Sequence, residues 1–379
     1  MTLGTPDETP PTGHPEPHRR RPRYPGTHPK RFEQHYKELD PAAYPEIHDH
    51  VRAQGRTPVG THVPVLVEEV LAALRPQPGD VVADCTIGYG GHAVEFIRRI
   101  GPSGRLIGLD VDAAQLERTA QRLGVPVTLD NGPNDTPTAA DRRQVSLQRS
   151  HFAGLGQVLG REGLDGCDII FADLGVSSMQ VDDPNRGFSY KYDGPLDMRM
   201  DARRARSAAD LLASLSVEEL SAALWELADE SDHERIARCI ARERAIKPIT
   251  RTWQLVDLVL AAKGSSRRAW RERPTEQRGE PHPAARTFQA LRMLVNDEVA
   301  GLEQLLRIAP YCLRPGGRIG IIGFHSGEDR RIKHSFRDGL RAGTYAAIAE
   351  GPIRPSPLEI ANNPRSRAAK LRWALKANT

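Results

Sequence analysis

The residues between Val81 and Asp110 restrict the fold of this chain more than any other segment. They form an apolar strand, a turn with glycine at 88, 90 and 91, a stretch of helical pattern, and a second apolar strand that ends on a carboxylate. Glycine lets the turn adopt positive φ and leaves room for a ligand beside the main chain. The first amides of the following helix also have no partner inside that helix. A carboxylate about 20 residues further on is placed to accept the hydroxyls of a ribose. The segment therefore predicts a site for a nucleotide-type cofactor.

The glycine pattern differs from the patterns of dinucleotide and phosphate loops. The run that starts at Gly88 has Ala93 where the pattern G-x-G-x-x-G needs its last glycine, and the lysine of a phosphate loop is absent. A pyrophosphate is therefore a weaker fit than an adenosine whose tail carries no phosphate, and S-adenosylmethionine is the commonest such cofactor. A glycine turn alone also occurs in ordinary connections between a strand and a helix.

Strands and helices alternate from His62 to Gly175, which predicts an α/β fold with a parallel sheet wrapped by helices. Three of the expected strands end on a carboxylate, namely Asp84, Asp110 and Asp173. Ligands of doubly wound sheets bind beyond the carboxyl ends of the strands. We therefore expect these three side chains around one crevice.

The alternation stops after Gly175 and gives way to helical patterns until about residue 286. Two capping boxes, at 216–219 and 231–234, predict the beginnings of two helices. The second of these helices would carry Arg235, Arg238 and Arg242 on one face. We expect an inserted all-helical domain.

The sheet is expected to resume after this insertion. Apolar residues at 3.6-residue spacing predict one long helix from Thr287 to Cys312. A last buried strand is expected at 318–323, ending next to His325. The predicted organisation is an arm at 1–60, a doubly wound domain at 61–180 and 287–379, and a substrate-recognition insertion at 181–286.

Composition adds limits on partners and location. The formal charge of the 379 residues is +4, but residues 235–286 hold 13 Lys and Arg against 5 Asp and Glu. Such a local excess favours a polyanionic partner, and a solvated helix face is an equal alternative. Residues 1–60 lack apolar periodicity, which predicts a disordered arm, and 131–143 reads as a surface loop. No apolar run is as long as a membrane span, and the four cysteines form no C-x-x-C pair, so we expect a cytoplasmic protein without a membrane or metal site.

Several runs in the chain resemble one bacterial family, the small-subunit ribosomal RNA cytosine-N4 methyltransferases called RsmH, formerly MraW. The runs are 62–69, 84–92, Asp-Leu-Gly-Val-Ser-Ser at 173–178, Arg-Gly-Phe-Ser at 186–189, Asp-Gly-Pro-Leu-Asp-Met-Arg-Met-Asp at 193–201, Arg-Thr-Phe-Gln-Ala at 286–290, Phe-His-Ser at 324–326 with Glu-Asp-Arg at 328–330, and Asn-Asn-Pro-Arg-Ser-Arg at 362–367. They cover most of the chain from His62 onward, in family order. As a set they are highly specific.

The resemblance implies a class I (Rossmann-like) methyltransferase fold and N4-methylation of a cytosine in the decoding region of the 16S RNA. The partner would be this RNA or the 30S particle, and a homodimer stays open. The S-adenosylmethionine contacts that the resemblance implies are Gly90, Gly91, His92, Asp110, Phe152, Asp173 and Gln180. The chain departs from the family at Tyr89, where an arginine is usual, which puts any role of that side chain in doubt.

The catalytic residues have to be inferred separately. The amino-methyltransferase loop Asp/Asn-Pro-Pro-aromatic is missing, because Asp173 is followed by Leu-Gly-Val. We expect Asp173 to accept the amine proton, with Asp197 and His325 as helpers. An ion pair of Asp197 with Arg199, and a backbone partner for His325, are about equally good readings. A DNA amino-methyltransferase and a non-catalytic, cofactor-binding ribosome assembly factor remain as alternative functions.

Overall fold

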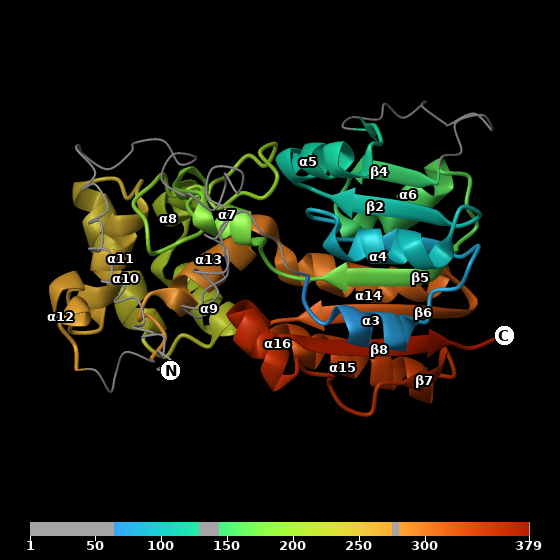
Figure 1. The fold of residues 1–379 in the computed structure, drawn as a ribbon. Coiled ribbons are helices and arrows are strands. Elements are labelled where there is room, and N and C mark those ends of the chain that lie inside the picture. The colour runs from blue at the N-terminus through green and yellow to red at the C-terminus, as the bar shows by residue number, and fades with distance from the viewer. Residues whose placement is uncertain (1–63, 129–143, 275–279, 379) are drawn as a thin grey trace, which may run out of the picture.

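The computed structural model describes residues 64–128, 144–274 and 280–378, and an eight-stranded sheet forms the centre of this described part (Figure 1). The expected arm at 1–60 lies outside the described residues, as does the loop at 131–143. The strands are β1 (Val81–Asp84), β2 (Arg105–Asp110), β3 (Val127–Thr128), β4 (Val145–Arg149), β5 (Cys167–Asp173), β6 (Leu313–Gly323), β7 (Tyr345–Ile348) and β8 (Lys370–Lys376).

The strands lie in the order β3-β4-β2-β1-β5-β6-β8-β7. The first six in this order pair in parallel, while β8 is antiparallel to both β6 and β7. After β1 the chain builds one half of the sheet through β2, and it later returns to the other side of β1 with β5. The expected doubly wound α/β fold is confirmed, and the crevice at this reversal is where such folds bind ligands.

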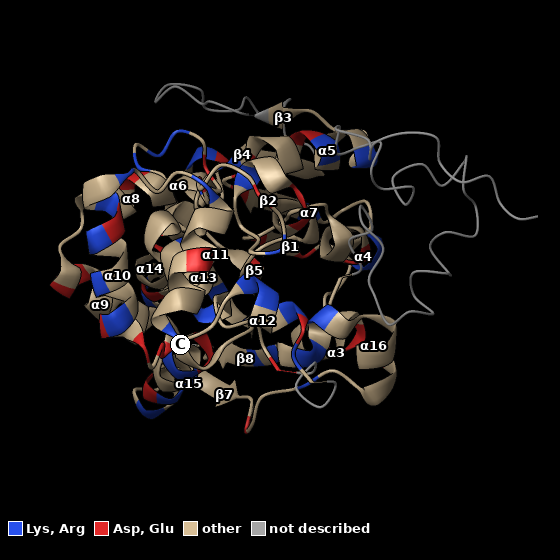
Figure 2. Ribbon diagram, turned by 90° about the vertical axis from the view of Figure 1, so that its left-hand side faces the viewer, with Lys and Arg blue, Asp and Glu red and all other residues tan. Residues whose placement is uncertain are grey.

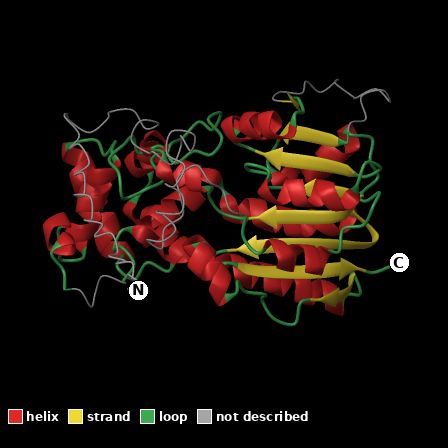
Figure 3. Cartoon of the chain, viewed as in Figure 1, coloured by secondary structure: helices red, strands yellow, loops and turns green. Residues whose placement is uncertain are grey.

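Helices cover both faces of the sheet, as Figure 3 shows. One face carries α3 (Val67–Leu74), α4 (Gly91–Ile100) and α5 (Ala113–Leu123), and the other carries α6 (Leu155–Arg161), α14 (Glu298–Cys312) and α15 (Ser326–Arg341). Each face has its own apolar core. Phe96 and Leu116 belong to the first core, and Leu305 and Phe336 belong to the second. The continuous apolar runs of the central strands therefore place apolar side chains on both faces of the sheet.

Helices without strands of the sheet form the remaining part of the described chain. They are α8 (Ala208–Ser214), α9 (Val217–Ala228), α10 (His233–Ile246), α11 (Thr252–Ala262), α12 (Arg267–Arg271) and α13 (Ala285–Asn296). They share a third apolar core that includes Leu212, Leu224, Ile240, Val259 and Leu291. The short elements α7 (Ser178–Asp182) and η4 (Pro184–Arg186) connect β5 to this part, and η3 (Phe152–Gly154), α16 (Pro357–Asn362) and η6 (Pro364–Ala368) complete the elements.

Three sequence expectations about these elements were wrong. The single long helix at 287–312 is two helices, because Asp297 adopts a left-handed conformation with φ of 51° between α13 and α14. The capping box expected at Ser231 does not form, since α10 begins at His233 after Asp232, whose side chain makes no capping hydrogen bond. The strand that ends at Gly323 is not the last, because β7 and β8 follow it.

Other boundaries agree more closely with the sequence pattern. The capping box from Ser216 to Glu219 is present at the start of α9. The strand expected at 318–323 is longer than predicted, since β6 begins at Leu313. None of the helices in the described ranges has the length and apolar character that crossing a membrane would require.

Candidate active site

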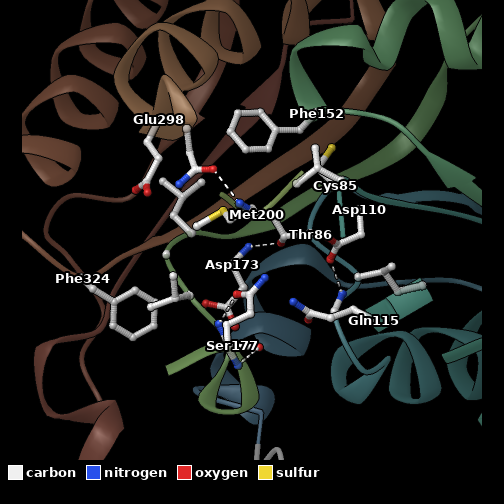
Figure 4. A pocket seen from close by; sticks show the side chains of 18 of the residues that line it. Cys85, Thr86, Asp110, Gln115, Phe152, Asp173, Ser177, Met200, Glu298 and Phe324 are labelled. Atoms are coloured by element: carbon white, nitrogen blue, oxygen red, sulfur yellow. Dashed lines mark hydrogen bonds between the residues drawn. The ribbon is translucent and has the colours of Figure 1, made fainter. Parts of the chain in front are cut away.

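A cavity of about 230 Å³ opens at the carboxyl ends of the central strands. Its wall is built from the segments after β1, β2, β4 and β5, from the start of α14 and from the residues that follow β6 (Figure 4). Among the residues expected to bind a cofactor, Gly91, His92, Asp110, Phe152, Asp173 and Gln180 all line this cavity. The sequence therefore assigned to one site residues as far apart as Gly91 and Gln180, and the fold brings them together.

The glycine turn after β1 has the backbone geometry that glycine allows. Gly88 and Gly90 have φ of 49° and 73°, and Gly90 precedes the first residue of α4. A Cβ on Gly90 would lie 3.1 Å from a methyl carbon of Thr119, so the turn is also tightly packed against α5. Gly90 itself does not line the cavity, while its neighbours Gly88 and Gly91 do. The role of Gly90 is therefore to shape the turn.

Asp110, at the end of β2, is fixed by backbone amides. Its two carboxylate oxygens accept hydrogen bonds from the N–H groups of Gly88 and Asp112, at 3.0 and 2.9 Å. Burial raises the pKa of Asp110 to about 6, although these amides oppose the increase. Each oxygen can accept a further hydrogen bond. The carboxylate is thus oriented by the glycine turn and remains able to receive two hydroxyl groups.

The adenosine side of the cavity also contains aromatic and amide side chains. Phe152 follows β4, and its ring packs against that of His151 with a centroid distance of 4.2 Å. Gln180 is in α7, where it completes a capping box with Ser177, and its amide nitrogen donates to Asp112 at 2.8 Å. Gln115, from α5, lines the same wall and was not identified from the sequence, because a Gln three residues after the N-cap Asp112 indicates a helix start and not a ligand contact.

Asp173, at the end of β5, has one unsatisfied carboxylate oxygen. Oδ1 is buried and has no hydrogen-bond partner in the described chain, while Oδ2 lies 4.0 Å from Nδ1 of His92. Burial raises the pKa of Asp173 to about 8, and the negative charges of Asp84 and Glu328 add to the increase. A buried, unpaired acceptor is costly for the folded state. This cost is relieved when a cation or an N–H donor occupies the cavity.

His92 is held at the edge of this acidic region. Its Nε2 lies 2.9 Å from the carbonyl oxygen of Val65, and its ring packs against Phe171 with a centroid distance of 4.6 Å. The backbone of the chain before α3 therefore fixes the imidazole, which keeps Nδ1 directed toward Asp173.

Asp84 does not share the cavity with the other two strand-end carboxylates. It is 1% exposed, and its Oδ1 accepts a hydrogen bond from the amide of Thr86. Burial raises the pKa of Asp84 to about 7. The expectation of three carboxylates around one crevice was wrong for Asp84. Its carboxylate is buried against the amide of Thr86 and does not line the cavity. Its charge nevertheless acts on Asp173.

The two expected helpers of Asp173 also lie outside the lining of the cavity. Asp197 accepts three hydrogen bonds from Arg199, one from its backbone and two from its guanidinium, and the ion pair bridges 2.7 Å. His325 caps the start of α15, and its Nε2 lies 3.1 Å from Glu328 without hydrogen-bond geometry. Local partners therefore occupy both side chains.

Three further lining residues were not assigned to the site from the sequence. Asn296 and Glu298 flank the break between α13 and α14, and Met200 belongs to the loop after η4. The side-chain amide of Asn296 accepts a hydrogen bond from the amide of Met200 and donates one to the carbonyl of Met198, both at 2.8 Å. The adjacent Asn-Asp pair at 296–297 is a signal for left-handed backbone that could have revealed the break.

The charges of the cavity suit an adenosine joined to a cationic tail. Asp110 provides acceptors for ribose hydroxyls, and Asp173, Glu298 and Glu328 add further carboxyl groups to the lining. Two arginines, Arg204 and Arg365, line the cavity as well. A ligand with a positive charge next to the adenosine would compensate these carboxylates.

Comparisons with known proteins give the family of the chain. Residues 60–377 match the model of the MraW methylase family. The protein named "Ribosomal RNA small subunit methyltransferase H 1" from Lachnoclostridium phytofermentans is 40% identical over 372 residues, which cover 97% of this chain and 96% of that protein. A protein named "Ribosomal RNA small subunit methyltransferase H" from Symbiobacterium thermophilum is 42% identical over 330 residues, covering 83% and 96%. This chain therefore belongs to the MraW methylase family.

Proposed function

We propose that this chain transfers a methyl group from S-adenosylmethionine to the N4 amine of a cytosine in the small-subunit ribosomal RNA. Membership of a methylase family and the names of the relatives support a methyltransferase that acts on this RNA. The observation that carries the chemistry is Asp173, which lines the same cavity as Asp110 and has one buried carboxylate oxygen without a hydrogen-bond partner in the described chain. The site thus combines a ribose acceptor with a proton acceptor.

Different residues of the cavity would hold the ribose, the adenine and the cationic tail of the cofactor. Asp110 would accept the ribose hydroxyls, Phe152 would pack against the adenine, and Gly91 would offer the free amides at the start of α4. Gln180 would complete the wall next to Asp112, and His92 and Asp173 would border the cationic tail. When bound, the cofactor supplies an electrophilic methyl group.

The residues around the amine have two tasks in this reaction. A cytosine amine is a poor nucleophile because its lone pair is delocalised into the ring, so the protein must hold it in line with the methyl group. The nitrogen must also lose a proton when it gains the methyl group, and the carboxylate of Asp173 would accept that proton. Asp197 and His325 would act as positioning residues, through Arg199 and Glu328.

The helical part at 181–286 is our candidate for RNA recognition, and α13 packs with it. In Figure 2 this part faces the viewer, and α10 carries both basic and acidic segments. Arg235 and Arg238 pair with Asp232 and Glu234, at 3.1 and 3.0 Å, while Arg242 is exposed. These exposed ion pairs are weak, so phosphates can replace the carboxylates.

We place the reaction in the cytoplasm, away from membranes, on the RNA itself or on the 30S particle, with a monomer or a homodimer as the active form. The experiment that tests the proposal is mass spectrometry of ribosomal RNA nucleosides from cells with and without the gene. Loss of N4-methylcytosine from the small-subunit RNA is the expected result. An unchanged nucleoside profile would favour a non-catalytic assembly factor, and competition by duplex DNA would favour a DNA amino-methyltransferase.

A further inference from the structure

The cavity has two halves that lie on opposite sides of β1. On one side Asp110 ends β2 and Phe152 follows β4, and this is the half that suits adenosine. On the other side Asp173 ends β5 and Phe324 follows β6, and Glu298 completes the wall from the start of α14 (Figure 4). If the cofactor fills the first half, as our proposed function requires, a methyl acceptor has only the second half to enter.

Glu298 is fixed in this second half by a two-pronged ion pair. Nε and an Nη of Arg292 each donate to a different oxygen of the Glu298 carboxylate, both at 2.8 Å. The two side chains are 15% and 14% exposed, and Arg292 does not line the cavity, whereas Glu298 does. The guanidinium therefore sets the plane of the carboxylate, and the outer side of each carboxylate oxygen remains free to accept a further hydrogen bond.

The carboxylate of Glu298 retains acceptor capacity toward that cavity. Two carboxylate oxygens offer about four acceptor positions, and Arg292 uses two. Burial raises the pKa of Glu298, and the Arg292 guanidinium opposes the increase. A buried ion pair adds little to stability compared with apolar side chains of similar volume. Stabilising the contact between α13 and α14 therefore does not by itself explain a carboxylate at the edge of the cavity.

Two neighbours indicate what this edge can bind. The ring of Phe324 lines the same half, and a Cβ on Gly175 would lie 3.7 Å from one of its carbons, so main chain rather than a side chain adjoins the ring there. An aromatic ring at the edge of a cavity is a surface on which a base can stack. Asp173 lines the same half, and its buried Oδ1 has no hydrogen-bond donor in the described chain. The second half of the cavity therefore combines a stacking surface with hydrogen-bond acceptors. It suits a planar ligand that carries N–H groups.

We propose that Glu298, oriented by Arg292, selects the target base by accepting a hydrogen bond from its exocyclic amine while the base lies against Phe324. Carboxylates pair with the amine of cytosine, and a uracil would present a carbonyl oxygen to the same carboxylate. Glu298 is then the specificity-determining residue of the base subsite. Arg292 is its positioning residue, and Asp173 remains the proton acceptor. This inference rests on the proposed function and names the residue that reads the base.

The test measures base preference rather than activity alone. The probes are small-subunit particles that lack the methyl mark and carry either cytosine or uridine at the position that the nucleoside analysis identifies. Binding is measured with S-adenosylhomocysteine present. We expect the wild-type protein to prefer cytosine particles by about tenfold or more, and Glu298→Gln to reduce this preference below about threefold. Its kcat/KM on cytosine particles should fall about 10- to 100-fold, while its affinity for S-adenosylmethionine in calorimetry stays within about twofold.

A matched variant separates base selection from stability. Glu162 forms a buried ion pair with Arg105 at 2.7 Å, and neither residue lines the cavity. Glu162→Gln should lower the thermal stability and leave the base preference unchanged. Arg292→Lys keeps the charge but loses one hydrogen bond to Glu298, so it should partially lower the preference for cytosine particles. This variant tests the inference if Glu298→Gln does not fold. Wild-type preference in both Glu298→Gln and Arg292→Lys would overturn the inference, whereas a wild-type protein that binds no S-adenosylmethionine would overturn the proposed function beneath it.

Discussion

Asp173 and His92 both line the cavity, where Oδ2 of Asp173 lies 4.0 Å from Nδ1 of His92, and the other oxygen of Asp173 has no hydrogen-bond partner among the described residues. Asp173→Asn removes the proton acceptor and the buried charge together. We expect methylation to be lost, with a decrease in kcat of at least about 100-fold. Binding of RNA should survive, because the phosphate contacts that we propose lie on α10. Filter binding and single-turnover methylation measure the two properties, and an equal loss of both would contradict this assignment.

The same substitution should make the protein more stable at neutral and alkaline pH. The pKa of Asp173 is raised to about 8 in the folded chain, so the folded state holds a proton that the unfolded state releases above pH 4. The stability contributed by this group therefore falls as the pH rises from about 4 to about 8. Asp173→Asn should raise the free energy of unfolding by about 1–3 kcal/mol at pH 8 and by almost nothing at pH 4. Denaturant unfolding at the two pH values checks the sign.

The pH dependence of methylation follows from the same carboxylate. Only the ionised form of Asp173 can accept the amine proton, and Asp84, Glu328 and burial all favour the neutral form. The value of kcat/KM should therefore rise about tenfold per pH unit below pH 8 and level off above it. A bound cation favours the carboxylate, so kcat should level off at a lower pH than kcat/KM. Identical profiles for both parameters would argue against a cation next to Asp173.

The strand ends were predictable from the sequence because the signal is local. An apolar run that stops at a carboxylate identified Asp110 and Asp173, and the sheet topology brings both to one edge. Asp197 does not follow such a run, and His325 does follow an apolar strand but lies two residues beyond its end. Whether these two side chains reach the cavity depends on the partners close to them. Asp197 pairs with Arg199 and His325 lies next to Glu328, so both are held outside the lining.

Glu298 was missed for a different reason. Apolar residues at helical spacing continue through 287–312, so the pattern alone indicated an unbroken helix. The break at Asp297 depends on long-range contacts, since Arg204 donates to the carbonyls of Val295 and Asn296. These contacts end α13 and turn the start of α14 toward the cavity. Tertiary interactions of this kind leave no trace in the periodicity of a single helix.

Asp110 provides a test of cofactor binding that is independent of catalysis. Asp110→Ala removes the acceptors proposed for the ribose and also releases the amides of Gly88 and Asp112. We expect the affinity for S-adenosylmethionine to fall by about 2–3 kcal/mol, or about 30- to 150-fold. Isothermal titration calorimetry measures it directly. Asp165→Ala, which removes an exposed carboxylate before β5, is the matched control and should bind normally.

Gly187 and Gly264 allow the cost of backbone strain to be separated from the cost of a clash. Both have positive φ, of 72° and 71°, but a Cβ on Gly187 would lie 2.2 Å from the carbonyl oxygen of Pro195, while nothing lies within 4 Å of one on Gly264. Gly264→Ala should cost about 1 kcal/mol of stability. Gly187→Ala should cost at least about 3 kcal/mol, because main chain cannot move aside easily. Similar unfolding midpoints for the two variants would contradict the close contact between Gly187 and the main chain at Pro195.

Arg235, Arg238 and Arg242 provide the test of the RNA surface. If phosphates displace Asp232 and Glu234 from the first two arginines, replacing all three by alanine should weaken RNA binding and lower the slope of log affinity against log salt by about 2 to 3. Methylation at saturating RNA should remain near the wild-type rate. Arg307, Arg337 and Arg341 form a matched control on α14 and α15, because two of them contact neighbours three residues away and Arg337 is exposed. The control triple variant carries the same change in net charge, so an equal loss of affinity in both would show that total charge, and not this face of α10, determines RNA binding.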